Sequence, residues 1–222
     1  MRIRWFGMTT IGVADDEGLL DLLAKSGCRT LYIGFESINS NCLGEVQKSW
    51  NKVENYTRNV RRLHDRDIMV NGSFVFGFDN DDSDVFSQTV QFGVEARLET
   101  ATFTILTPYP GTLLHKKLDS EGRITNRNWA HYDTTHVVFR PKRMSAAELE
   151  AGYFRAYKDF YSWRSIFARC RLQEPGSAKR LLLNIAYKKL EPAYSPLGKY
   201  LRAGWARPIM DWFARSNIAQ QH

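Results

Sequence analysis

The sequence predicts an α/β fold in which about four parallel β/α units are followed by a mainly helical C-terminal extension. Strand-like runs rich in Ile, Val, Phe, Tyr and Thr alternate four times with helix-like runs over residues 1–122. These strand-like runs are long and apolar rather than strictly alternating, which is typical of a covered parallel sheet. After residue 122 the chain becomes irregular and aromatic, and then basic and helix-like.

The expected strands span residues 3–11, 30–36, 68–78 and 102–107, and the expected helices span residues 15–26, 53–67, 83–97 and 113–120. Gly27 stands where a C-terminal helix cap is expected. Val53, Tyr56, Val60 and Leu63 recur at helical spacing and define one apolar face. Because a complete eight-fold barrel requires about 250 residues, four units form either a doubly wound sheet or part of a β/α barrel.

The C-terminal extension starts with an irregular segment, residues 123–143, and continues with two expected helices. Ser145 and Glu148 have the spacing of a capping box, which opens a helix expected to run to about residue 171. Tyr153, Phe160 and Phe167 recur every seven residues and predict one apolar stripe that packs on the barrel. The chain is thus divided into residues 1–122, 123–171 and 172–222.

Composition indicates a globular protein of a reducing compartment. The 222 residues are 43% hydrophobic and 25% charged, close to the globular average. The three cysteines, Cys28, Cys42 and Cys170, are widely separated and form no CxxC or CxxxC pair, which argues against a disulfide framework. The first residues lack the apolar stretch of a signal peptide. We therefore expect a cytoplasmic location.

The net charge of +7 belongs to the C-terminal part of the chain, because residues 140–222 contain 16 Lys and Arg but 6 Asp and Glu. Trp205 and Trp212 stand among these basic residues, a composition that suits an interfacial helix on an anionic membrane surface. The alternatives are a solvated basic surface and docking onto another part of the protein. Nucleic acid is not expected as a partner.

Candidate binding residues lie at the ends of the expected strands, where the loops of a β/α fold converge. The second strand ends with Gly34-Phe35-Glu36-Ser37, and Glu36 can accept hydrogen bonds from hydroxyl or ammonium groups. The third strand contains Gly72 and Gly77, which permit close backbone approach. The fourth ends with Leu106-Thr107-Pro108-Tyr109-Pro110-Gly111-Thr112, a type II turn followed by a capping threonine.

Other site classes find little support. Residues 79–84 are acidic, but Asp84 and Val90 occupy positions where a calcium loop requires Gly and Glu, and an acidic helix cap explains them better. His131 and His136 form a weak pair without zinc spacing. No phosphate loop, dinucleotide fingerprint or nucleophile elbow occurs.

Together, the strand ends GFES, GSFVFGFD and LTPYPGT resemble the later strands of radical S-adenosylmethionine (SAM) enzymes, in the branch that has a cobalamin-binding domain and includes hopanoid-modifying enzymes. The segments from Trp129 to Asp133 and from His136 to Phe139 are also similar to that branch. The resemblance covers about residues 3–170. It implies a partial (β/α) barrel that contains units three to six of six.

The resemblance also implies cofactors and site residues. The family holds SAM and a 4Fe-4S cluster, and cobalamin is expected for the intact protein. Glu36 and Ser37 would bind the ribose or methionine part of SAM. Gly72 and Gly77 would let their strand approach the ligand, and the segment from Leu106 to Pro108 would lie near the adenine.

The sequence departs from the family in one large respect, because the CxxxCxxC motif that ligates the cluster is absent. We therefore expect this chain to be the C-terminal part of a radical SAM enzyme. The intact protein is expected to methylate an unknown, lipid-like substrate, and this chain alone is expected to be inactive. The alternatives are a non-catalytic remnant or binding module with a membrane-docking tail, and an unrelated β/α-barrel enzyme.

Overall fold

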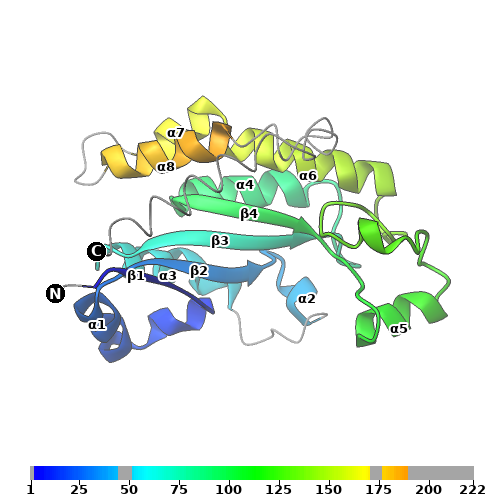
Figure 1. Ribbon diagram of the computed structural model, residues 1–222, viewed down its shortest axis with the longest axis horizontal. Coiled ribbons are helices and arrows are strands. Elements are labelled where there is room, and N and C mark those ends of the chain that lie inside the picture. Colours follow the sequence, from blue (N-terminus) through cyan, green and yellow to red (C-terminus); the bar gives the residue numbers. More distant parts are fainter. Residues whose placement is uncertain (1–2, 45–51, 171–176, 190–222) are drawn as a thin grey trace, which may run out of the picture.

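The computed structural model describes residues 3–44, 52–170 and 177–189 of the chain. Its centre is one sheet of four parallel strands, in the order β1-β2-β3-β4 that they have in the sequence. The strands are β1 (Trp5–Thr9), β2 (Cys28–Glu36), β3 (Met69–Phe76) and β4 (Thr100–Ile105). Figure 1 shows their arrowheads pointing toward one edge of the sheet. The predicted partial barrel of four β/α units is confirmed.

A helix follows each strand, and two of these helices have the caps that the sequence predicts. The helices are α1 (Glu17–Ser26), α3 (Tyr56–His64), α4 (Val85–Glu95) and α5 (Leu113–Ser120), with short turns η1 (Ile11–Asp15), α2 (Ser40–Leu43) and η3 (Val53–Asn55). Gly27 caps α1 with φ of 97°, in the left-handed region that glycine adopts without strain. Thr112 caps α5 by accepting a hydrogen bond from the amide of His115.

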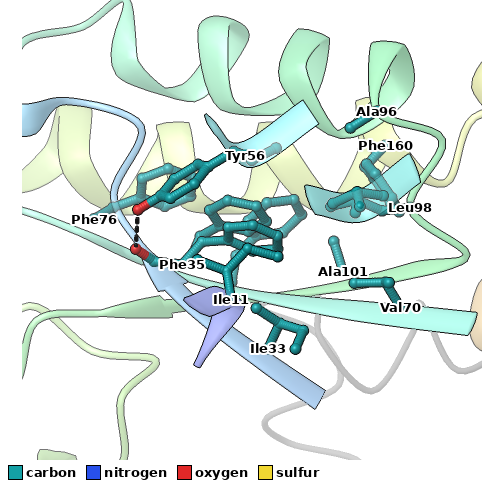
Figure 2. Packing of buried hydrophobic residues seen from close by; sticks show 14 of the residues in the cluster. Ile11, Ile33, Phe35, Tyr56, Val70, Phe76, Ala96, Leu98, Ala101 and Phe160 are labelled. Atoms are coloured by element: carbon teal, nitrogen blue, oxygen red, sulfur yellow. Dashed lines mark hydrogen bonds between the residues drawn. The ribbon is translucent and has the colours of Figure 1, made fainter. Parts of the chain in front are cut away.

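One face of the sheet is covered by helices, and its core is built from stacked aromatic rings. Phe35 stacks on Phe74 with ring centroids 5.3 Å apart, and Phe103 stacks on Phe76 at 5.5 Å. The hydroxyl of Tyr56 donates a hydrogen bond to the carbonyl oxygen of Phe35, drawn as the dashed line in Figure 2. Burial of these large rings supplies much of the driving force for folding.

Among the described residues, no helix packs across the opposite face of the sheet, although Tyr187 of α8 (Ser177–Lys189) reaches the side chain of Asn71 there. The side chains of this face include Tyr32 of β2, Asn71 and Ser73 of β3, and Thr102 of β4, which are half-buried. On the edge strand β1, Phe6 and Met8 share this face, because they pair with Thr30 and Tyr32. Their exposed fractions of 81% and 77% mark an apolar surface at this end of the face.

The C-terminal extension packs as three helices along the β4 edge of the sheet (Figure 1): α6 (Ala146–Phe160), α7 (Trp163–Cys170) and α8 (Ser177–Lys189). The capping box of Ser145 and Glu148 is confirmed. The prediction of a single helix up to residue 171 is wrong, because the helix ends at Phe160 and a second helix starts at Trp163. The hydroxyl of Ser162 accepts a hydrogen bond from the Ser165 amide at the start of α7. No described helix is long and apolar enough to span a bilayer.

The break also ends the predicted apolar stripe. Tyr153 and Phe160 are buried as expected, but Phe167 is half exposed and stacks on Trp163. Beyond the break, α7 instead turns Ile166, Arg169 and Cys170 toward the core. The buried positions of α7 therefore do not continue the seven-residue spacing of the buried positions of α6. The predicted interfacial helix with Trp205 and Trp212 lies outside the described residues.

Candidate functional site

Parallel pairing places the carboxyl ends of all four strands at one edge of the sheet, and most of the predicted site residues lie there. Glu36 ends β2, Gly77 follows β3, and Leu106 and Pro108 follow β4. Gly72 instead lies inside β3, paired with Ile33 of β2 and Ala101 of β4. In Figure 1, α2 and α5 lie beyond the arrowheads at this edge.

Glu36 is the acidic residue at the end of β2. Its φ of 64° lies in the left-handed region, and the register between β2 and β3 shifts between Gly34 and Glu36. Such a bulge redirects a side chain at the end of a strand. Its side chain is half-buried, which leaves a carboxylate at the rim that can accept hydrogen bonds from a polar ligand.

Ser37 is buried, and its hydroxyl already has a structural partner. It accepts a hydrogen bond from the amide of Asn39 at 3.0 Å, and its own amide donates to the carbonyl oxygen of Phe35 at 2.8 Å. The hydroxyl of Tyr56 contacts the carbonyl oxygens of Phe35 and Ser37. These contacts fix the turn that presents Glu36.

The two predicted glycines are required by close packing on the covered face. A Cβ on Gly72 would lie 2.7 Å from Leu98 and 2.9 Å from Phe74. A Cβ on Gly77 would lie 2.9 Å from Leu149, and its φ of 105° disfavours other residues. Packing thus explains both glycines, and their approach to a ligand stays a prediction.

The acidic segment after β3 is organised by Asp81, which is 1% exposed. Its carboxylate accepts hydrogen bonds from the amides of Gly77 at 2.9 Å and Phe78 at 3.0 Å. Its other oxygen lies 3.2 Å from the thiol of Cys42 in α2, which links the ends of β2 and β3. The expected acidic cap is only partly right, since Asp84 occupies the N-cap of α4 without a side-chain hydrogen bond.

Asp79, in the same segment, joins the end of β3 to the C-terminal extension. Its carboxylate forms ion pairs with Arg123 at 2.8 Å, Lys142 at 2.8 Å and Lys117 at 3.0 Å. Burial alone raises the pKa of Asp79, but these three cations outweigh it and hold the pKa well below its ordinary value. The carboxylate therefore stays ionised, as a structural anchor does.

The segment after β4 forms the predicted turn. The Leu106 amide donates to the carbonyl oxygen of Phe76 at 2.9 Å, and the Thr112 amide donates to that of Tyr109. Gly111 has a φ of 85°, as the third residue of a type II turn requires. Pro108 is buried while Tyr109 is 46% exposed. The backbone of residues 106–108 is thereby fixed at the rim.

Sequence reasoning missed a second polar cluster at the same edge. The amide of Ile105, the last residue of β4, donates to the carbonyl oxygen of Thr134 at 2.7 Å. This bond places the segment of Asp133 and His136 at the carboxyl edge, and His131 stacks on His136 with ring centroids 4.6 Å apart. The sequence showed two histidines five residues apart but not their stacking.

A polar cavity of about 340 Å³ lies elsewhere, near the C-terminal ends of α3 and α4. Arg61, His64 and Arg97 line it, and the buried Glu99 lies at its wall with Arg169 and Arg180. Cations gather at helix C-termini because the carbonyl ends of helices carry partial negative charge. Since helix dipoles and Glu99 explain these arginines, we assign no ligand to the cavity.

The cysteines of the chain do not fit a 4Fe-4S cluster. Cys28 is the first residue of β2, Cys42 lies in α2 beyond the other end of that strand, and Cys170 ends α7. All three are buried. Burial raises the pKa of the Cys28 and Cys170 thiols, which opposes thiolate formation. Within the described ranges, no group of three metal-ligating side chains converges.

Comparison with known proteins gives matches over most of the chain. Residues 112–183 match a family model described as a domain of unknown function (DUF4070). Over 167 residues, 75% of this chain and 36% of the relative, the chain is 32% identical to bacteriochlorophyllide d C-12(1)-methyltransferase of Chlorobaculum tepidum. Over 211 residues it is 24% identical to the anaerobic magnesium-protoporphyrin IX monomethyl ester cyclase of Cereibacter sphaeroides, covering 95% of this chain and 32% of the relative.

A solved structure is similar as well. It is the radical S-adenosylmethionine methyltransferase TsrM of Kitasatospora setae with cobalamin and a [4Fe-4S] cluster bound, with a TM-score of 0.48, 20% identity, and coverage of 71% of this chain and 28% of that one. The chain therefore spans about a third of the length of the relatives it matches.

Proposed function

We propose that this chain, a member of the cobalamin-type branch of the radical SAM superfamily, forms the SAM-facing part of a methyltransferase. The observation that supports this most is the 32% identity to a named methyltransferase over 75% of the chain. The edge formed by the ends of four parallel strands, where β/α folds bind ligands, is consistent with it.

The proposed SAM site uses the carboxyl edge and the uncovered face of the sheet. Glu36 would accept hydrogen bonds from the ribose hydroxyls or the ammonium group of SAM, with Ser37 contributing through the turn that it fixes. The backbone from Leu106 to Pro108 would lie against the adenine. Gly72 and Gly77 would keep β3 close to the ligand.

In the intact protein, a 4Fe-4S cluster held outside this chain would supply the electron for reductive cleavage of SAM. Because the three cysteines of this chain do not converge, we propose that the chain by itself does not cleave SAM. Its own residues would bind and orient SAM and exclude water from one side of it.

The proposed substrate is large, polycyclic and mostly apolar. Two relatives are named for bacteriochlorophyllide d and for magnesium-protoporphyrin IX monomethyl ester. The uncovered face, with Phe6 and Met8 exposed at one end, offers the apolar surface that such a substrate requires. A lipid-like polycycle is a substrate of the same kind.

Calorimetric titration with SAM tests the site, using Glu36→Gln and the control Glu95→Gln, which alters an exposed carboxylate on α4. We expect the wild type to bind SAM weakly, Glu36→Gln to bind at least about tenfold more weakly, and Glu95→Gln to bind like the wild type. No binding by the wild type at millimolar SAM, or equal binding by Glu36→Gln, would contradict the proposal.

Anaerobic reconstitution with iron and sulfide tests the proposed inactivity. We expect far less than four irons per chain and no 5′-deoxyadenosine after addition of dithionite and SAM. About four irons per chain with SAM cleavage would overturn this part of the proposal.

The alternative function is a binding module that docks on an anionic membrane, which the excess of Lys and Arg over residues 140–222 supports. In α8, however, Arg180 pairs with Glu99 and Lys188 donates to the carbonyl oxygen of Tyr161, so part of this charge is used within the chain. Flotation with phosphatidylglycerol vesicles separates the two functions, because only a docking module floats at low salt and stays behind at high salt.

A further inference from the structure

We propose that Nε2 of His136 is the axial ligand for the metal centre of a tetrapyrrole-type macrocycle bound at the carboxyl edge of the sheet. The macrocycle is either the substrate, in which case the inference rests on the proposed function, or a corrin cofactor. Both present the same chemistry, a metal held by four ring nitrogens whose axial position is open or holds a water molecule that an imidazole can displace.

The carboxylate of Asp133 fixes which nitrogen of His136 is available. Oδ1 of Asp133 lies 2.8 Å from Nδ1 of His136. A carboxylate can only accept, so Nδ1 carries the proton and Nε2 keeps its lone pair. The same oxygen of Asp133 also accepts hydrogen bonds from the amide and the hydroxyl of Thr135, both at 2.9 Å, which hold the carboxylate in this position. Histidines that ligate metals nearly always have such a partner on the other ring nitrogen.

His131, although stacked on His136, has the opposite arrangement. Oδ1 of Asn126 accepts from the amide of Asn128 at 2.8 Å, which turns Nδ2 of Asn126 toward Nδ1 of His131 at 2.7 Å. Nδ1 of His131 is therefore the acceptor, and its Nε2 carries the proton. The ring planes differ by 11°, so His131 packs against the ring face of His136. Its own Nε2 offers a hydrogen-bond donor and no lone pair for a metal.

The two imidazoles are also accessible and lie at the candidate site. The side chain of His136 is 27% exposed, and the described residues contribute no hydrogen bond to its Nε2. The bond between Thr134 and the last residue of β4 ties the segment to the carboxyl edge. Nearby in the chain, Trp129 is 63% exposed and lies 5.1 Å from the Tyr132 ring, and an exposed indole can stack on a flat ring.

A macrocycle fits this site better than a free metal ion. A structural or catalytic zinc site requires at least three protein ligands, and the described part of the chain has no such group. One imidazole suffices where a macrocycle supplies the equatorial ligands, as for haem iron with a proximal histidine. A single oriented histidine therefore indicates a metal that arrives with its other ligands.

Absorption titrations of the purified chain with zinc protoporphyrin IX and with hydroxocobalamin test the inference and separate the two macrocycle sources. Metal-free protoporphyrin IX is the control ligand, because it can stack but has no metal to ligate. We expect binding to the wild type to shift the Soret band of zinc protoporphyrin to longer wavelength if the ligand is a porphyrin. If the ligand is a corrin, the absorption bands of hydroxocobalamin should shift instead. His136→Ala should abolish the shift, and Asp133→Asn should weaken binding about 10- to 100-fold.

His131→Phe is the matched control, because it keeps a stacked ring and removes the other imidazole. We expect it to bind within about threefold of the wild type, and added imidazole to restore the shift in His136→Ala. The inference is wrong if neither macrocycle shifts with the wild type, if His136→Ala shifts equally, or if only His131→Phe loses the shift. A SAM titration on the same sample distinguishes this failure from failure of the proposed function.

Discussion

The hydroxyl of Tyr157 in α6 donates a hydrogen bond to the carbonyl oxygen of Phe103 and accepts one from the amide of the same residue, both at 3.0 Å. Tyr161 makes the same pair of bonds to Ala101, at 2.8 and 3.1 Å. With Thr134 on Ile105, these contacts satisfy the outer edge of β4. Edge strands otherwise present unpaired backbone groups, so the sheet ends at β4, whereas no described strand pairs with the outer edge of β1.

We expect Tyr157→Phe to lower the free energy of unfolding by about 1–3 kcal/mol, because two buried backbone groups lose their partner. Urea unfolding at neutral pH measures the change. Tyr109→Phe, which removes the hydroxyl of a tyrosine that is 46% exposed, is the control and should change little. Equal stability of Tyr157→Phe and the wild type would show that the hydroxyl does not stabilise the edge.

Asp81→Ala should lower the free energy of unfolding strongly, because the carboxylate is buried. The substitution removes the acceptor for the buried amides of Gly77 and Phe78, and we expect a loss of about 2–4 kcal/mol. Cys42→Ala removes only the weaker thiol contact and should cost less. The comparison uses urea unfolding of both variants, and a larger loss for Cys42→Ala would contradict the assigned role of Asp81.

Most of the fold could be predicted from the sequence because its signals are local. The apolar runs, the capping residues Thr112 and Ser145, and the glycine at position 27 act within one turn of chain, and the structure follows them. The break after Phe160 could not be predicted, since Tyr161 is held by Ala101 of β4, 60 residues earlier. Neither partner alone indicates that contact.

The candidate site divides in the same way. Parallel topology predicts that Glu36 and Pro108 lie at the same carboxyl edge of the sheet, because this placement depends on the backbone alone. In the sequence, Asp81 is one of four aspartates in an acidic segment, and nothing local distinguishes it as the one that becomes buried. His131, Asp133 and His136 stand in a segment without periodicity, so their arrangement depends on the contact between Thr134 and Ile105.

Gly152→Ala should destabilise the chain although alanine is the better helix former. Gly152 lies inside α6, where exchange to alanine would otherwise stabilise by about 1 kcal/mol. Here the added Cβ would lie 2.2–2.5 Å from ring atoms of Phe86, so we expect a net loss of about 1–3 kcal/mol from overpacking. Thermal unfolding compares it with Gly44→Ala, whose Cβ meets nothing within 4 Å. A stabilised Gly152→Ala variant would mean that α6 and α4 separate easily.

The ion cluster of Asp79 should make stability depend on pH in acid. Its folded-state pKa lies below the unfolded value, so the unfolded chain binds the proton more readily. The stabilisation is therefore fully present above about pH 5 and is lost as the pH falls through the unfolded value near 4 toward the folded one. We expect Asp79→Asn to be less stable than the wild type by about 1–3 kcal/mol at pH 7, and the difference to shrink between pH 5 and pH 2.5.

Urea unfolding of both proteins across that range measures the difference directly, so that other titrating carboxylates largely cancel. Asp82→Asn is the control, because Asp82 is half exposed and lies 3.6 Å from Arg143, and exposed pairs contribute little. A difference between the wild type and Asp79→Asn that stays constant down to pH 2.5 would show that Arg123, Lys117 and Lys142 do not hold the carboxylate ionised.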